Sequence, residues 1–186
     1  MTSTNTARRP ATGRMLWGQV VLEWRLFWRT PISAFFSIFF PLLLFVVFAL
    51  VFGNERIEYL DITTAQFYAP SLAVFSAVSA TYTTIAITTA YQRDEGILKR
   101  VRGTPLPSWI YLAGKIISAT INAAIGTTIM LGVGVLFFDL RLYADSILVL
   151  VLIFIIGTFC FAALGLLVAA VAPSGQAATA IANSTL

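Results

Sequence analysis

The chain has 186 residues, of which 59% are hydrophobic and 11% are charged, and its net charge is +4. Soluble globular domains carry roughly 25% charged residues, so this composition excludes a soluble domain. It also excludes a disordered chain, which needs low hydrophobicity and high charge. The positive charge is too modest and too scattered for a nucleic-acid partner. We therefore expect an integral membrane protein.

Histidine and cysteine usage limits the chemistry that this chain can perform. The chain has no His and one cysteine, Cys160. Histidine acid–base chemistry and an intrachain disulfide are therefore excluded, and no cluster has metal-ligand spacing. No G-x-x-x-x-G-K-[ST] phosphate loop occurs either. We predict no catalytic residue, no metal and no cofactor in this chain.

Long segments without charge predict membrane helices, each of which needs about 20 residues to cross the bilayer. Their continuous apolar runs favour helices over the alternating strands of a membrane barrel. The last segment is too long for one span, and Pro173-Ser174-Gly175 breaks it. The predicted spans are 31–53, 67–92, 109–138 and 146–172, with a partial fifth over 176–186. Because this fifth helix is too short to cross, we expect the chain to be a fragment.

The segment before the first span divides into two parts. Residues 1–13 are rich in Thr, Ala, Arg and Pro and are predicted to form a disordered cytoplasmic tail. Residues 14–29 place Trp17, Trp24 and Trp28 on one helical face, which predicts an interfacial helix on the membrane surface. Two roles for this helix stay open: simple anchoring, or contact with a cytoplasmic partner.

The basic residues predict the orientation in the membrane. All Lys and Arg except Arg56 and Arg141 precede the first span or lie around the 93–107 loop. Cytoplasmic loops carry such an excess, so the N-terminus and this loop are predicted to be cytoplasmic. Lys115 lies near the cytoplasmic end of the third span, from where its side chain can reach the membrane surface.

The densest polar segment is the loop over 93–107. Between Gly96 and Gly103, Ile97, Leu98 and Val101 line one side of a predicted short amphipathic helix, with basic residues around them, and Pro107-Ser108 opens the next helix. On charge alone, an ordinary cytoplasmic loop explains the segment as well. The charged residues and the glycine at issue in this segment are Arg93, Asp94, Glu95, Gly96, Lys99, Arg100 and Arg102, to which the resemblance described next gives an ATPase-coupling role.

The same loop resembles a known signature. Glu-Gly-Ile-Leu-Lys-Arg-Val-Arg-Gly-Thr-Pro-Leu-Pro, from Glu95 onward, resembles the motif E-x-G-(T/I)-L-(K/E)-R-(L/V)-(R/L)-x-(S/T)-P of ABC-2 type transporter permeases. Glu95 directly precedes Gly96, whereas the family motif places one residue between them; Asp94 supplies an acid at that spacing. The subgroup most similar to this chain is the daunorubicin-resistance-like drug exporters.

The resemblance implies an all-α membrane fold of six helices, of which this chain supplies four and the start of a fifth. It implies a bacterial or archaeal plasma-membrane permease that pairs with a second permease copy, identical or related, and with separate ABC ATPase subunits that bind Mg-ATP. The 93–107 loop would carry the coupling helix over 94–102, with Gly96 and Gly103 as bend points. A hydrophobic or amphipathic substrate, such as a drug, antibiotic or lipid-like molecule, would be exported. From the residues alone, a non-transporting scaffold or regulatory protein is the alternative.

Hydroxyl groups crowd the second span, and they have two explanations. In lipid they either hold helices together or line a polar pathway, and both remain open. Small residues such as Gly126 and Gly165 predict close helix packing, and Asn122 is expected to bond a neighbouring helix. The candidate pathway residues are Ser76, Ser79, Tyr82, Thr83 and Asn122. No charged residue is predicted deep in a span, which argues against a proton-coupled carrier.

Overall fold

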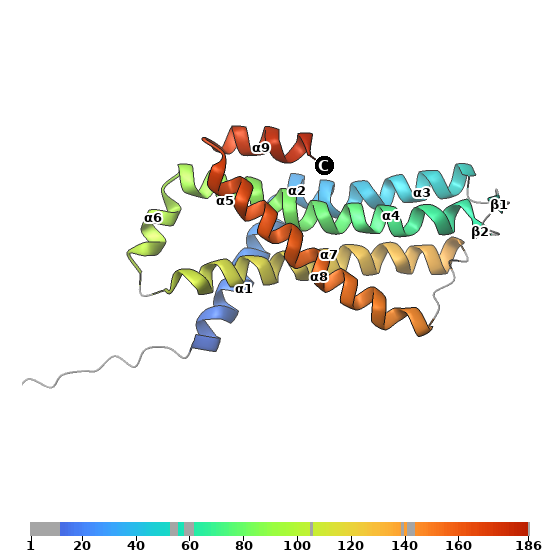
Figure 1. Ribbon diagram of the computed structural model, residues 1–186, viewed down its shortest axis with the longest axis horizontal. Coiled ribbons are helices and arrows are strands. Elements are labelled where there is room, and N and C mark those ends of the chain that lie inside the picture. Colours follow the sequence, from blue (N-terminus) through green and yellow to red (C-terminus); the bar gives the residue numbers. More distant parts are fainter. Residues whose placement is uncertain are drawn as a thin grey trace, which may run out of the picture.

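The computed structural model describes residues 12–52, 56–57, 62–104, 106–138, 140 and 144–185. Helices dominate this part of the chain and form an elongated bundle (Figure 1). A short helix, α6 (Ile97–Arg102), lies at one end of the bundle, and the strands β1 (Arg56–Ile57) and β2 (Ile62–Thr63) lie at the other (Figure 1). We refer to these as the α6 end and the β end.

The N-terminal helix α1 (Thr12–Arg29) begins two residues before the predicted 14–29. Residues 12 and 13 of the predicted tail are therefore helical, and the rest of that tail lies outside the described residues. Thr30 separates α1 from the next helix, and Pro31 occupies the first turn, where its fixed φ favours helix and its missing N–H costs nothing. The first span consists of α2 (Pro31–Ala34), the π-helix η1 (Phe35–Phe39) and α3 (Phe40–Phe52).

The second span begins at the β end. Strands β1 and β2 pair antiparallel, with Ile57 opposite Ile62, in the segment between the first two predicted spans. The helix begins at Thr64 instead of 67, because the Thr63 hydroxyl caps it by accepting the Gln66 N–H at 3.3 Å. The span consists of α4 (Thr64–Val78), the π-helix η2 (Ser79–Thr83) and α5 (Thr84–Asp94).

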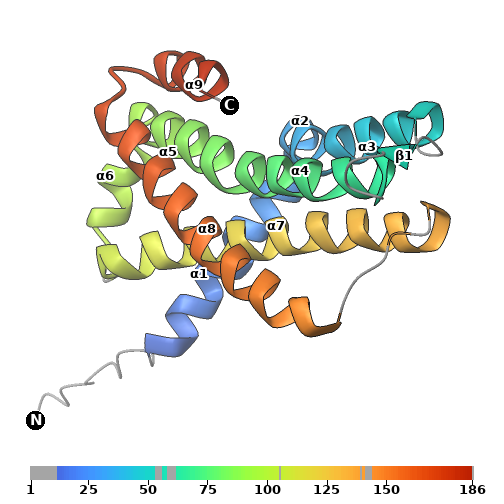
Figure 2. The same cartoon turned by 45° about the vertical axis from the view of Figure 1, so that its right-hand side comes forward.

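The described residues after α5 form α6 and three further helices. They are α7 (Ser108–Phe138), α8 (Ala144–Val171) and α9 (Gly175–Ser184). The predicted breaks at Pro107-Ser108 and at Pro173 are confirmed, and the Ser174 hydroxyl caps α9 by accepting the Ala177 N–H at 3.2 Å. Figures 1 and 2 show α9 turning back along α5 after α8 ends.

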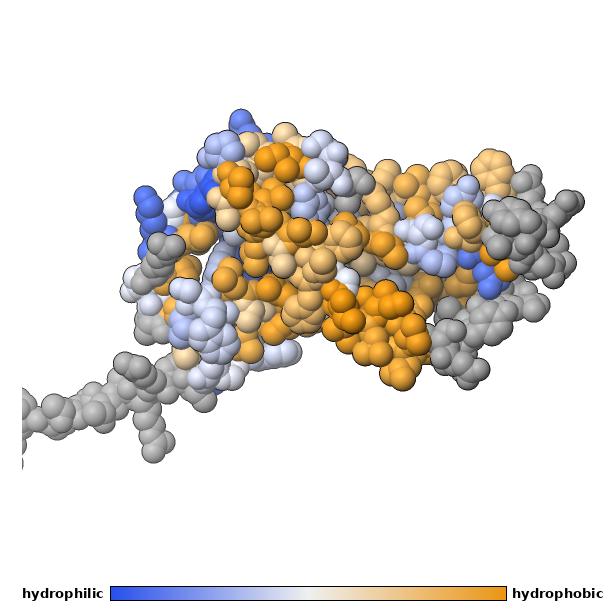
Figure 3. All heavy atoms as spheres, viewed as in Figure 1, coloured by the Kyte–Doolittle hydropathy of each residue, from blue (hydrophilic) through white to orange (hydrophobic). Residues whose placement is uncertain are grey.

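The predicted all-α membrane fold is confirmed. Within the described residues, four helical segments are long and apolar enough to cross a bilayer: Pro31–Phe52, Thr64–Asp94, Ser108–Phe138 and Ile147–Val171. Large apolar side chains point outward from α8, including Leu148, Ile153 and Ile156. Figure 3 shows hydrophobic residues along this surface and hydrophilic ones gathered at the α6 end. This distribution suits helices that face lipid.

Small residues allow the helices to approach closely, as the sequence predicts. A Cβ added to Gly165 in α8 would lie 2.7 Å from the carbonyl oxygen of Tyr82 in η2. A Cβ on Gly126 in α7 would lie 2.9 Å from Ser76 Oγ. Both distances are shorter than van der Waals contact, so only glycine fits these two crossings without a shift.

The two π-helices were not predicted, and they lie next to each other in the bundle. Ser76 Oγ, just before η2, donates to the carbonyl of Ser37 in η1 at 2.7 Å. The Thr84 hydroxyl donates to the Ser79 carbonyl, five residues earlier, at 3.1 Å. Hydroxyls thus satisfy backbone groups where the regular helical ladder is interrupted.

Candidate functional site

The loop that the sequence singled out forms the short helix α6 between α5 and α7. Gly96 precedes it with φ +72°, a left-handed conformation that glycine adopts without a steric penalty. Gly103 follows α6, and Pro107 lies directly before α7. The helix is shorter than the predicted 94–102, because Asp94 completes α5 and Glu95 ends it.

Arg93 and Asp94 bind the turn between α8 and α9. The Arg93 guanidinium donates to the carbonyls of Ala169 at 2.8 Å and Ala172 at 2.7 Å, at the C-terminus of α8. Asp94 Oδ2 accepts the Gly175 N–H at the start of α9 at 2.6 Å. A cation meets the carbonyl end of one helix and an anion the amide end of the next, which is the favourable sense for both helix dipoles. We call this pair of contacts the α8–α9 clamp.

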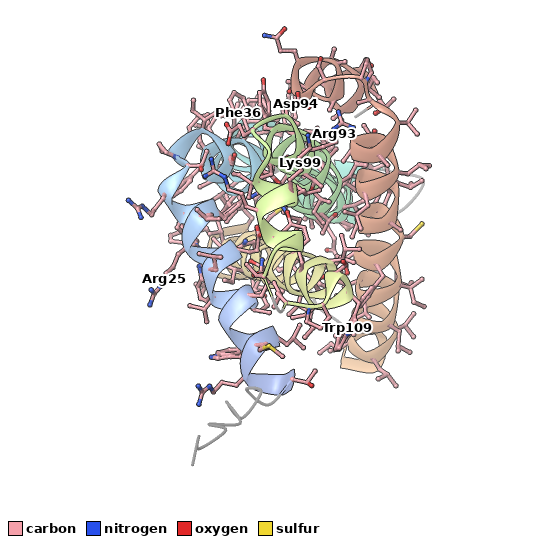
Figure 4. The ribbon with its side chains drawn as sticks, turned by 90° about the vertical axis from the view of Figure 1, so that its left-hand side faces the viewer. Arg25, Phe36, Arg93, Asp94, Lys99 and Trp109 are labelled. Atoms are coloured by element: carbon pink, nitrogen blue, oxygen red, sulfur yellow. The ribbon has the colours of Figure 1, made fainter. Side chains whose placement is uncertain are left out.

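The other charged residues of the predicted site face outward. Glu95, Lys99 and Arg100 are exposed, while the side chain of Arg102 lies outside the described part. Figure 4 looks onto the α6 end and shows Lys99 on α6, with Arg93 and Asp94 toward α8 and α9. The predicted set therefore divides into the two partly exposed clamp residues, which bind α8 and α9, and a group that makes no such contact.

A buried ion pair lies beside this region, between α1 and α7. Lys115 is only 3% exposed, so its side chain does not reach the surface as expected. Its Nζ lies 3.6 Å from Glu23 Oε2 in α1, and it donates to Gln92 Oε1 at 2.8 Å and Thr88 Oγ1 at 3.3 Å in α5. The Tyr111 hydroxyl donates to the same Gln92 oxygen at 2.5 Å. One network of side chains thus joins three helices.

The predicted pathway residues do not gather in one place. Ser76 binds the Ser37 carbonyl, and the Tyr82 hydroxyl lies 2.6 Å from Thr185 Oγ1 beyond α9, so both hold helices together. Ser79 is buried in η2, and Thr83 Oγ1 is buried without a partner among the described residues. Helix adhesion therefore accounts for Ser76 and Tyr82.

Asn122 lines a cavity that the other four candidate pathway residues do not line. It is 2% exposed, and its Oδ1 has no hydrogen-bond partner within the described part of the chain, so the expected bond to another helix is not formed there. It lines a cavity of about 530 Å³ between α1, α5 and α7. We call this the polar cavity, lined by Glu23, Leu26, Phe27, Thr30, Ser33, Thr84, Ile85, Ile87, Thr88, Tyr91, Gln92, Glu95, Ile97, Lys115, Ser118, Ala119 and Asn122.

Comparison with known proteins agrees with this helical arrangement. The family model described as "ABC-2 type transporter" matches residues 17–186. The chain belongs to the ABC-2 type transporter family. Among curated proteins, "Putative transport permease YvfS" of Bacillus subtilis (strain 168) is 29% identical over 101 residues. This match covers 54% of the present chain and 41% of that relative, and no solved structure matches the chain.

The sequence of this ABC-2 family member did not predict the Glu23–Lys115 ion pair or the α8–α9 clamp. Glu23 and Lys115 each resemble ordinary interfacial charges in sequence, and nothing local indicates that they meet. The one available signal was the polar side of 14–29, since Gln19 and Glu23 lie opposite the Trp face. In the structure Gln19 is buried and donates to Glu23 Oε1 at 3.2 Å, whereas Trp17 is exposed.

Proposed function

We propose that this chain is the membrane-spanning permease subunit of an ATP-driven exporter whose ATP is bound and hydrolysed by a separate ABC ATPase. In this proposal α6 is the coupling helix that contacts the ATPase. The observation that carries the proposal is the short helix α6 itself, held outside the bundle with Glu95, Lys99 and Arg100 exposed. Membership of the ABC-2 type transporter family supports the transport role.

The α8–α9 clamp supports a mechanical role for this end of the molecule. Arg93 and Asp94 precede Gly96 and α6, and they also hold the end of α8 and the start of α9. A displacement of α6 by ATPase closure would reach α8 and α9 through these side chains, and η2 through α5. The positive φ of Gly96 provides the bend between α5 and α6.

The exported molecule is proposed to be hydrophobic or amphipathic. The outward surface of the spans is apolar, and the one buried charged residue in the described part, Lys115, already has Glu23 as its partner. A proton-coupled carrier needs a buried titratable group that is free to exchange protons along a pathway. An ATP-driven mechanism needs no such group.

The test is co-purification with a candidate ATPase in detergent. The double variant Glu95→Lys/Arg100→Glu reverses two exposed charges of the loop and should abolish capture, since such charges set partner choice and orientation. The variant Glu95→Asp/Arg100→Lys keeps both charges and should retain capture. Capture lost with Arg25→Glu alone would assign the contact to α1. Capture unaffected by every variant would contradict the coupling role of α6, and no capture at all would favour the scaffold alternative.

A further inference from the structure

A second cavity, of about 540 Å³, lies between α8 and the α4–η2 segment, and α7 and Leu140 contribute the rest of its lining. Figures 1 and 2 show how it arises: α8 crosses the bundle obliquely, and its first turns lie apart from α4. Its later turns pack closely, since Gly165 approaches the Tyr82 carbonyl and Ala169 packs with Ala90. We call the space beside the first half of α8 the apolar groove.

The apolar groove follows the helices for roughly the depth of one lipid leaflet. One wall extends from Gln66 to Thr81, and the α8 wall extends from Val149 to Phe161, both starting toward the β end. At 1.5 Å per residue these stretches are about 22 Å and 18 Å long. Half of a hydrocarbon core of about 30 Å is about 15 Å. The long shape therefore suits one extended hydrocarbon chain of the leaflet at the β end.

The lining of the apolar groove offers a ligand no charge and little hydrogen bonding. None of the described residues that line it is charged. The Thr81 and Thr158 hydroxyls donate to carbonyls of their own helices, four and three residues earlier, at 2.7 Å and 3.0 Å. The Thr127 hydroxyl is buried. Apart from Gln66 toward the β end, the groove therefore presents hydrocarbon, which suits an uncharged and apolar ligand.

A glycine in the middle of the α8 wall keeps the groove open. The lining residues of α8 recur at intervals of three and four between Val149 and Phe161, so one face of the helix borders the groove, with Gly157 central on that face. A Cβ added to Gly157 would meet no described atom within 4 Å. A Cβ added to Gly165, two turns later, would lie 2.7 Å from the Tyr82 carbonyl oxygen. Gly165 thus serves close packing, whereas Gly157 leaves a space unfilled.

The surroundings of the groove decide what fills this space. Water has no polar partners on such a wall, and an empty gap loses the dispersion contacts of its lining. The hydrophobic effect does not press helices together in lipid, so it does not close the gap either. The groove opens onto the outward surface of α8, where Leu148 and Ile156 are exposed and the apolar face suits lipid. Acyl chains of the bilayer therefore have direct access to it.

We propose that the apolar groove binds one acyl chain of a phospholipid from the leaflet at the β end. The acyl chain fills the space at Gly157 and separates the first turns of α8 from α4, so the bound lipid maintains the oblique angle of α8. This binding involves neither α6 nor an ATPase. Its test therefore fails or succeeds separately from the exporter proposal.

The test measures how tightly the protein binds a single lipid. The protein in glyco-diosgenin, a steroid-based detergent without a linear chain, is titrated with dioleoyl-phosphatidylcholine, and native mass spectrometry gives the fraction that carries one lipid. Gly157→Phe places a ring in the groove and should weaken this binding at least about tenfold, because excluding two methylenes has an effect of that size. Gly132→Phe is the matched control: a Cβ on Gly132 in α7 also meets no described atom within 4 Å, but Gly132 does not line the groove. It should bind as wild type does.

Photolabelling of the wild type locates the lipid, and it keeps the test decisive where Gly157→Phe does not fold. A phosphatidylcholine with a diazirine in the middle of one acyl chain should label enclosed residues of the two walls, such as Ala77 and Phe154, and excess unlabelled lipid should abolish these adducts. Adducts confined to outward-facing residues such as Leu148 and Ile156, or equal lipid binding by Gly157→Phe and wild type, would overturn the proposal. So would a dimer that excludes the lipid, because a second copy would then occupy the groove.

Discussion

The Lys115 side chain is the most enclosed charged group in the described part of the chain, at 3% exposure, and its partner Glu23 is 10% exposed. Removing an ammonium and a carboxylate from water costs several kcal/mol each, which the attraction between them and further hydrogen bonds must offset. Gln92 and Thr88 supply those further bonds to Lys115. The pair therefore fixes where α1 meets α7 and α5.

Lys115→Met should destabilise the protein by about 3–5 kcal/mol, because it leaves the Glu23 carboxylate enclosed without its cation. The double variant Glu23→Gln/Lys115→Met should recover much of that loss. Thermal unfolding in detergent measures both. The control is Lys99→Met on the exposed surface of α6, expected to change stability by no more than about 0.5 kcal/mol. If Lys115→Met lowers stability no more than Lys99→Met does, the buried Glu23–Lys115 pair contributes little to the stability of the fold.

At the scale of elements, the α8–α9 clamp joins three parts of the chain that are distant in sequence. Arg93 satisfies carbonyls that a helix C-terminus leaves unpaired, and Asp94 satisfies an amide that a helix N-terminus leaves unpaired. Ala90, Ala169 and Ala178 pack together beside these contacts. The clamp thus orients α9 against α5, and through α5 it connects α9 with α6.

Arg93→Met keeps the length of the side chain but removes its donors, so the α8–α9 turn should open more often. Hydrogen exchange of the amides over 172–178 should accelerate at least about tenfold, since hydrogen bonds to a charged group contribute about 1.5–3 kcal/mol. Arg100→Gln, which changes an exposed arginine of α6, should leave this exchange unchanged. Unaltered protection in Arg93→Met would mean that packing alone holds the turn.

The crossing of α7 with α4 and η1 depends on glycine at one position. Gly126→Ala would place a Cβ 2.9 Å from Ser76 Oγ, which also donates to the Ser37 carbonyl. We expect a loss of about 1–3 kcal/mol, typical of overpacking. Gly132→Ala on the same helix meets no atom within 4 Å and should be neutral or slightly stabilising, because alanine favours helix. If Gly126→Ala and Gly132→Ala unfold at the same midpoint, the close approach of α7 to α4 and η1 at Gly126 is contradicted.

On the scale of the whole molecule, the structural features that the sequence predicted are those that depend on residues close together along the chain. Charge-free runs predicted the spans, Pro107 and Pro173 predicted the breaks, and the Gly96–Gly103 spacing predicted a short helix between two spans. The Glu23–Lys115 pair was not predictable, because it depends on how α1 lies across α7. The clamp was missed for the same reason: Arg93 is recognisable as a loop charge, but only the fold brings the end of α8 beside it.

We propose that α6 is the exposed charged helix that contacts the ATPase, and the proposed function depends on this contact. Its most direct test is site-specific photocross-linking. Cys160→Ser removes the single cysteine of the chain, so a benzophenone maleimide can then be attached to Lys99→Cys on α6 or to Phe137→Cys near the β end. We predict a cross-link to the ATPase from position 99 and none from position 137. No ATPase adduct from position 99, in a complex that nevertheless co-purifies, would contradict the account.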